Sequence, residues 1–120
     1  MVTAIASSLR NSFRDALATA LDGGSVVVKA TATTLVTFSL GSSPFTNGTG
    51  TLTLTATKTA TASGGSGATP TSADWRDSSN NVLFTVTSGL SGTELNWDGT
   101  ITSGQTCNLS SGYVLTIPAN

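Results

Sequence analysis

Histidine is absent from this 120-residue chain, and charged residues are few: five Lys or Arg against six Asp or Glu, for a net charge of −1. Without His, the chain has no Ser-His-Asp triad, no His general base and no His metal ligand. Five scattered basic residues are too few for the positive stripe that nucleic-acid binding requires. No apolar run approaches the roughly 20 residues of a membrane-spanning helix. We therefore expect a structural or binding role, with no cofactor or metal and no nucleic-acid, membrane or small-molecule partner.

Few of the remaining residues carry reactive groups. The single cysteine, Cys107, excludes an intrachain disulfide and a Cys-only zinc site. No basic cluster flanks it to lower its thiol pKa, so we expect a small buried residue rather than a reactive thiol. A carboxylate-pair hydrolase would need two of Asp74, Asp77, Glu94 and Asp98 at a fixed separation, which their spacing does not require. The chain is expected not to be an enzyme.

The first segment has the pattern of an amphipathic helix. Apolar residues recur at every fourth position, which places Ile5, Leu9, Phe13, Leu17 and Leu21 on one helical stripe. Thr3 is a candidate cap for its start, and Gly23-Gly24 can supply the left-handed residue that ends it. The stripe favours packing on the protein's own sheet, and docking on a neighbouring subunit is the alternative.

The start of the chain also bears on where the protein is made. Ala18-Thr19-Ala20 resembles a signal-peptidase site, but Arg10, Arg14 and Asp15 interrupt the stretch where a signal peptide needs an apolar core. We expect no signal peptide and synthesis in the cytoplasm.

From residue 25 onward the apolar period changes to two, which predicts strands. The first two are expected at residues 25–30 and 34–40. Asn47-Gly48 is a turn signal, because both residues tolerate a positive φ. Residues 49–61 then alternate so regularly that they predict one long strand, with Leu52, Leu54 and Ala56 on its buried face and threonines on the other.

The second half of the chain predicts a hairpin and further short strands. Residues 73–77 and 82–87 flank a turn at residues 78–81, and later strands are expected at residues 94–97, 101–102 and 112–117. Seven or eight short strands with one N-terminal amphipathic helix predict a mainly β protein, an antiparallel β-sandwich or jelly roll. We expect one domain, in which residues 1–24 form a helix on or beside the β domain of residues 25–120.

Three aromatic residues allow two interpretations. Trp75, Trp97 and Tyr113 could form a platform on which sugars stack, since aromatic faces suit the apolar faces of sugars. Core packing uses the same large side chains and is the favoured interpretation.

The order of these segments resembles a known group of proteins. The matching stretches are residues 8–11, 35–40 before Pro44-Phe45, 59–64, 73–78, 94–97, 101–105 and 113–120. Together they resemble small virion proteins of tailed bacteriophages, with a short N-terminal helix ending in Gly and a β domain rich in Thr, Ala and Gly.

The resemblance implies a capsid cement or decoration protein, located in the virion on the capsid surface and made in the bacterial cytoplasm. Its implied partners are the major capsid protein and further copies of itself, as a dimer or trimer. Such families have no catalytic residues to carry over. The candidate partner contacts lie at the N-terminus, at Met1, Val2, Thr3, Ile5, Leu9 and Phe13. The alternatives are a tail, neck or fibre component, with which a long strand over residues 49–61 is compatible, and a carbohydrate-binding module.

Overall fold

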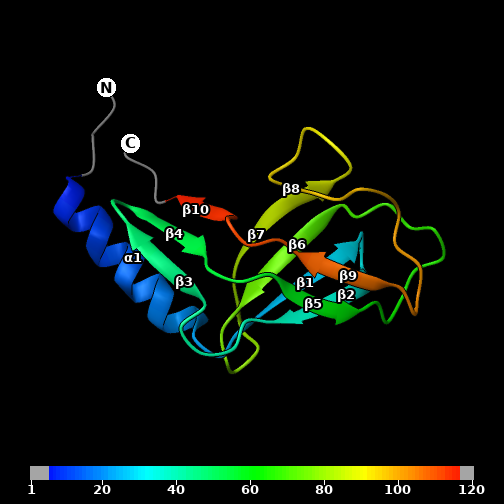
Figure 1. Cartoon of the computed structure of the whole chain (residues 1–120), viewed down its shortest axis with the longest axis horizontal. Helices are drawn as coiled ribbons and strands as arrows, with labels where there is room; N and C mark the ends of the chain where they lie inside the picture. Colours follow the sequence, from blue (N-terminus) through cyan, green and yellow to red (C-terminus); the bar gives the residue numbers. More distant parts are fainter. Residues whose placement is uncertain (1–5, 117–120) are drawn as a thin grey trace.

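The structure, a computed structural model, describes residues 6–116, which form one helix and ten strands (Figure 1). The prediction of a mainly β protein with one N-terminal helix is confirmed. The elements run in the order α1 (Ser7–Leu21), β1 (Ser25–Ala30), β2 (Thr33–Ser39), β3 (Phe45–Gly48), β4 (Thr51–Leu54), β5 (Lys58–Thr61), β6 (Ser72–Arg76), β7 (Val82–Gly89), β8 (Leu95–Asn96), β9 (Thr106–Leu109) and β10 (Val114–Thr116).

The strands form three sheets. A curled five-stranded sheet has the order β2-β1-β6-β7-β8, a three-stranded sheet the order β10-β4-β3, and β5 pairs with β9. Neighbouring strands are antiparallel except β7 and β8, which pair in parallel through two residues each. Strand β1 lies between β2 and β6, and its three consecutive valines, residues 26–28, are all buried. A strand covered on both faces needs such a continuous apolar run, whereas a half-exposed strand alternates.

The core draws residues from all three sheets and from the end of the helix. Trp75 of β6 is fully buried there, and its ring contacts Phe45 of β3 at a centroid distance of 6.2 Å. The same core cluster includes Leu21 at the end of the helix, Phe38 of β2 and Leu52 of β4. Burying such large side chains contributes about 1.5–3 kcal/mol each, so this cluster is the main source of the fold's stability.

The hairpin at residues 78–81 forms as predicted. Strands β6 and β7 pair antiparallel on either side of it, and Asn80 takes a left-handed conformation with φ of 69°. The Asp77 carboxylate accepts hydrogen bonds from the backbone N–H groups of Ser79 and Asn81, both at 2.9 Å. The backbone hydrogen bond from Asn81 contributes most to lowering the pKa of Asp77 below its usual value. Asp77 is thus a turn-forming residue.

The turn predicted at Asn47-Gly48 is two residues too early. Both residues lie in β3, and the hairpin turns at Thr49 and Gly50, where Gly50 has a φ of 63°. Gly48 pairs with Thr51, which leaves a two-residue loop. The shift by two residues keeps the alternation of faces, so Leu52 and Leu54 are buried as expected.

The single strand predicted over residues 49–61 is also wrong. The chain is extended in β4, breaks at residues 55–57 and resumes in β5, which belongs to a different sheet. At the break, Thr55 donates from its backbone N–H and from its hydroxyl to the Pro44 carbonyl. Ala56, expected on the buried face, is exposed. The regular Thr alternation continues through the break because both strands favour β-branched residues, so the pattern hides the change of sheet.

Candidate interaction groove

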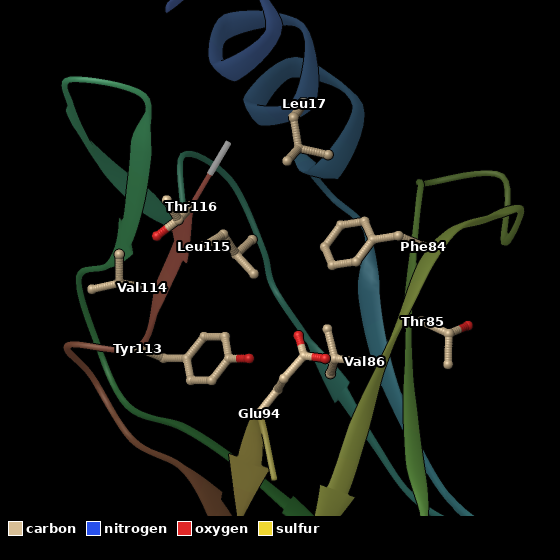
Figure 2. Close-up of a pocket in the computed structure, with 9 residues that line it drawn as sticks. All are labelled: Leu17, Phe84, Thr85, Val86, Glu94, Tyr113, Val114, Leu115 and Thr116. Atoms are coloured by element: carbon tan, nitrogen blue, oxygen red, sulfur yellow. The ribbon is translucent and has the colours of Figure 1, made fainter. Parts of the chain in front are cut away.

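A groove of about 500 Å³ opens between β7 and β10 beside the helix (Figure 2). Its lining is apolar at the floor, with threonines along the walls and one carboxylate at one end. The lining residues are Leu17, Phe84, Thr85, Val86, Glu94, Tyr113, Val114, Leu115 and Thr116. Figure 2 shows the side chains of Phe84 and Leu115 directed toward each other across the opening.

The β7 wall of the groove is an unpaired strand edge. Strand β7 pairs with β6 along one side, while β8 covers its other side only at Ser88 and Gly89. Ser88 donates its backbone N–H to Thr71, toward the β6 side. Because hydrogen bonding alternates along an antiparallel strand, the backbone N–H and C=O groups of Thr85 are directed to the opposite side, into the groove. No other strand of residues 6–116 pairs with them there.

The β10 wall is a second unpaired edge. In the two-residue hairpin, Gly48 and Thr51 form a hydrogen-bonded pair, so the backbone of Leu52 is directed the other way, toward its partner Leu115 of β10. The backbone groups of Val114 and Thr116 therefore face away from β4, toward the groove. In the described part of the chain β10 has β4 as its strand neighbour, and its outer edge is uncovered.

A fully buried ring stacks on one aromatic residue from each side of the groove. Trp75 lies between Phe84 of β7, at 5.7 Å, and Tyr113 next to β10, at 5.6 Å, with interplanar angles of 9° and 19°. Stacked pairs at these centroid separations are favourable beyond the area they bury. The indole Nε1 of Trp75 is buried and has no hydrogen-bond partner among the described residues.

Glu94 gives one end of the groove a negative charge. Its carboxylate lies near the Tyr113 hydroxyl and Val86 in Figure 2. Burial raises the pKa of Tyr113, and the Glu94 charge raises it further, so the phenol stays protonated at neutral pH and keeps its O–H donor. No Lys or Arg of the described chain pairs with Glu94, which is solvent-exposed.

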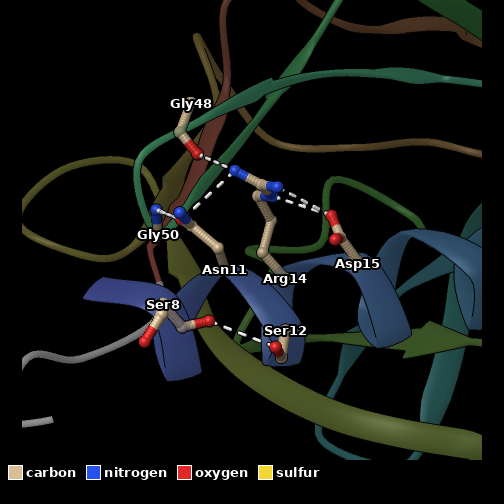
Figure 3. A network of polar contacts seen from close by, with 7 residues as sticks. All are labelled: Ser8, Asn11, Ser12, Arg14, Asp15, Gly48 and Gly50. Carbon is tan, nitrogen blue, oxygen red and sulfur yellow. Dashed lines mark hydrogen bonds and ion pairs between the residues drawn. The ribbon is translucent and has the colours of Figure 1, made fainter. Parts of the chain in front are cut away.

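The helix that borders the groove is held by polar contacts with the β3–β4 turn (Figure 3). Arg14 donates to the Gly48 carbonyl at 2.6 Å, and Asn11 accepts from the Gly50 N–H at 2.9 Å. Arg14 also pairs with Asp15 at 2.8 Å. These bonds fix the side of α1 that faces the turn, and they place Leu17 at the groove.

The helix ends as expected but starts differently. Gly23, with φ of 75°, is the left-handed residue that follows it. Ala6 occupies the N-cap position without a side-chain cap, and the predicted cap Thr3 lies outside the described residues. Of the apolar stripe, Leu21 is buried in the core and Leu17 is partly buried against it.

The predicted partner contacts fall into two groups. Met1, Val2, Thr3 and Ile5 lie outside the described residues. Leu9 and Phe13 are 48% and 49% exposed, unusually high for large apolar residues on a helix stripe. With Leu17 they follow a spacing of four residues along one helical face. The exposed residues Leu9 and Phe13 therefore lie on the same helical face as Leu17, which lines the groove.

The three aromatic residues considered for a sugar platform do not share a surface. Trp75 is fully buried in the core, and Tyr113 stacks on it. Trp97 stacks instead on Phe38, at 5.8 Å, and donates its indole N–H to Ser88 Oγ. Their positions agree with the core-packing interpretation.

The acidic residues are dispersed, and the most buried one forms an ion cluster. Burial raises the pKa of Asp74, but hydrogen bonds from Lys29, Thr85 and Arg76 outweigh this effect and hold it below its usual value. No group of three or more His, Cys, Asp or Glu within residues 6–116 could hold a metal ion. Cys107 is buried as predicted, and burial raises the pKa of its thiol.

Glu94 and Tyr113 stand out in the sequence as an acidic and an aromatic residue, but no sequence pattern brings them together at one groove. The pairs Phe84/Val86 and Tyr113/Leu115 each alternate as expected for strands, but alternation carries no information on which edges remain unpaired. Comparison with protein-family models, with curated proteins and with solved structures found no match. Within the described part of the chain, no helix is long and apolar enough to cross a membrane.

Proposed function

We propose that this chain is a structural protein that binds another protein, and specifically that it binds and stabilises a bacteriophage capsid as a cement or decoration protein. The groove between β7 and β10 is the observation that carries the binding role. An apolar floor flanked by unpaired backbone groups is suited to a polypeptide partner, because both the side chains and the main chain of that partner would gain contacts. The capsid assignment draws on the sequence resemblance to phage virion proteins.

The distribution of charge supports a protein partner. Asp74 is compensated by Lys29 and Arg76, Asp15 pairs with Arg14, and Asp22 and Asp77 accept backbone hydrogen bonds, so four of the six acidic residues serve the fold. Much of the exterior carries hydroxyl groups, as at the exposed threonines 59 and 61 of β5. A nearly neutral surface of this kind binds weakly per copy and gains strength when many copies attach to one lattice. Self-association as a dimer or trimer on a capsid axis belongs to the same proposal.

The proposal extends to the architecture. We infer an antiparallel sandwich or jelly roll in which the five-stranded and three-stranded sheets are the two layers. The contacts of Trp75 support this, because its ring touches Phe45 and Tyr113 from the opposing sheet region as well as Phe84 of its own sheet. Side chains that interdigitate between two sheets are characteristic of sandwiches.

The tail, neck or fibre alternative drew on one long strand over residues 49–61. In the structure these residues form two short strands in different sheets. The long strand therefore no longer supports a tail, neck or fibre role. The number of copies per virion then distinguishes a capsid location from a tail, neck or fibre location.

The test is the stoichiometry of the chain in purified particles of the phage that encodes it. Quantitative mass spectrometry, with the major capsid protein as internal reference, should give a copy number that scales with the capsid lattice. A handful of copies per particle would place the chain in a tail or neck instead, and complete absence from the particles would overturn the virion proposal. A second measurement compares the temperature of capsid disruption with and without the protein, which should be higher when the protein is bound.

A further inference from the structure

We propose that the groove takes an extended segment of the partner protein as an added β-strand between β7 and β10, with a Lys or Arg of that segment beside Glu94. The inference deepens the proposed protein-binding function and rests on it. It assigns the partner's recognition element as a strand, rather than a helix or a folded surface.

The backbone geometry favours a strand. Both walls direct main-chain groups into the groove, from Thr85 on one side and from Val114 and Thr116 on the other. A helix satisfies its own backbone hydrogen bonds internally and would leave these groups unpaired, whereas an extended chain has donors and acceptors on both sides. Insertion of one strand would join the five-stranded sheet to the three-stranded sheet.

The length of the uncovered edge sets the length of the segment. Residues 82–86 of β7 are uncovered on the groove side before the pairing with β8 begins. At a rise of about 3.3 Å per residue, five or six residues of a partner would span this edge. The exposed side chains of Leu9 and Phe13 lie on the helical face that leads to the groove, where the residues flanking the segment would pack.

The floor and the single charge define the composition of the segment. Alternate side chains of an added strand would face Leu17, Phe84 and Leu115, and these positions call for apolar residues. Glu94 is the one Asp, Glu, Lys or Arg among the groove-lining residues, and it has no ion-pair partner in the described chain. A cation at one end of the segment would complement it, and a carboxylate there would be repelled.

The test uses a defined peptide, acetylated and amidated, with the sequence Lys-Thr-Val-Thr-Val-Thr-Lys. Lys at both ends allows either strand direction to place a cation beside Glu94. Titration into the ¹⁵N-labelled full chain should shift the amide resonances of Thr85, Val114 and Thr116. Absence of binding at the highest soluble peptide concentration, or shifts confined to another surface, would overturn the proposal.

Backbone involvement is tested by Val114→Pro against the matched control Val114→Thr. Proline removes the N–H that faces the groove without touching the β4 ladder, and Val114 is 48% exposed, so the side-chain change is mild. We expect peptide affinity to fall about tenfold in Val114→Pro, because one hydrogen bond is lost and the ring obstructs the edge. Val114→Thr keeps the N–H and should bind like wild type. Equal affinity of the two variants would refute strand addition.

The charge is tested independently by Glu94→Lys, a substitution at an exposed position that leaves the core intact even if Val114→Pro fails to fold. Wild type should bind the Lys-ended peptide about two- to fivefold more tightly than the same peptide with Glu at both ends. Glu94→Lys should reverse that preference. An unchanged preference would remove Glu94 from the recognition element and overturn that part of the proposal.

A second copy of this chain is the competing occupant. Sedimentation without peptide distinguishes the two occupants. If wild type self-associates and Val114→Pro does not, the groove serves self-assembly, and the proposal that a segment of another protein occupies it is refuted. The virion measurement remains separate from these tests. If the chain is abundant on capsids but does not bind the peptide, the proposed function stands and strand addition is refuted. If the chain binds the peptide but is absent from virions, strand addition stands and the capsid function is refuted.

Discussion

Replacement of Asp74 by Asn tests how strongly the ion cluster holds the five-stranded sheet together. The Asp74 carboxylate lies 2.9 Å from Lys29 Nζ on β1 and 3.2 Å from Arg76 Nη2, and accepts a 2.8 Å hydrogen bond from Thr85 on β7. The side chains of Asp74, Lys29 and Arg76 are 10%, 25% and 18% exposed. Hydrogen bonds to charged groups contribute about 1.5–3 kcal/mol, and the residual solvent contact reduces this. We expect Asp74→Asn to lower the free energy of unfolding at neutral pH by about 2 kcal/mol.

The effect of Asp74→Asn should depend on pH in a defined direction. The pKa of Asp74 in the folded protein is lowered from 3.8. A carboxyl group of this kind stabilises the fold fully above its unfolded-state pKa, and loses that contribution as the pH falls through its folded-state pKa. The difference between wild type and variant should therefore be full at neutral pH and shrink as the pH drops below 3.8, because Asp74 of wild type then also becomes neutral.

Urea denaturation followed by circular dichroism, at neutral pH and at about pH 2, measures both parts of this prediction. Asp98→Asn is the matched control, since it makes the same change of charge at an exposed residue that has no ion pair in the described chain. That control should alter stability by less than about 0.5 kcal/mol. The reasoning fails if Asp74→Asn costs no more than the control, or if its cost is the same at both pH values.

Two further predictions concern packing. Gly64→Ala should lower the free energy of unfolding by about 2 kcal/mol in thermal denaturation, because an added Cβ would collide with the backbone carbonyl of Thr34. The control Gly99→Ala places its Cβ in open space and should be neutral or slightly stabilising. Equal effects at the two sites would contradict the close approach of Gly64 to Thr34. Leu21→Ala should cost about 3 kcal/mol because Leu21 is fully buried, while Leu9→Ala, at a residue that is 48% exposed, should cost less than about 1 kcal/mol in the same urea assay. A large loss at Leu9 would show that the exposed stripe is part of the core.

Local signals in the sequence predicted local structure well. The turn at residues 78–81 carries its own stabilising contacts, because Asp77 binds the backbone within four residues of itself. Gly23 likewise ends the helix through its own conformation. The short strand β9 was not predicted, since its four residues, with Cys107 and Leu109 buried, form too short an alternation to stand out. The total of seven or eight strands was too low, because β3 was also not predicted and residues 49–61 form two strands, whereas the strand predicted at residues 101–102 is a single bridge at Ile101.

Structure that depends on distant partners was not predictable in this way. The break at residues 55–57 arises because β4 pairs with β3 and β10 while β5 pairs with β9, more than 40 residues further along the chain. The groove has the same origin. Phe84 and Tyr113 are 29 positions apart in the sequence, and only the pairing order of the strands makes them the two sides of one opening. A pattern of alternating residues identifies strands but leaves their neighbours undetermined.

The ring stack beneath the groove has a consequence for the cost of binding. Phe84 belongs to one wall, Tyr113 to the other, and both lie flat against Trp75. Neither wall can move outward without separating a ring from the indole, so the spacing between the walls is set before any partner arrives. A site held ready in this way requires little ordering on association, and the entropy lost on binding falls almost wholly on the incoming chain. Partners that are already extended would then have the advantage over partners that must first unfold.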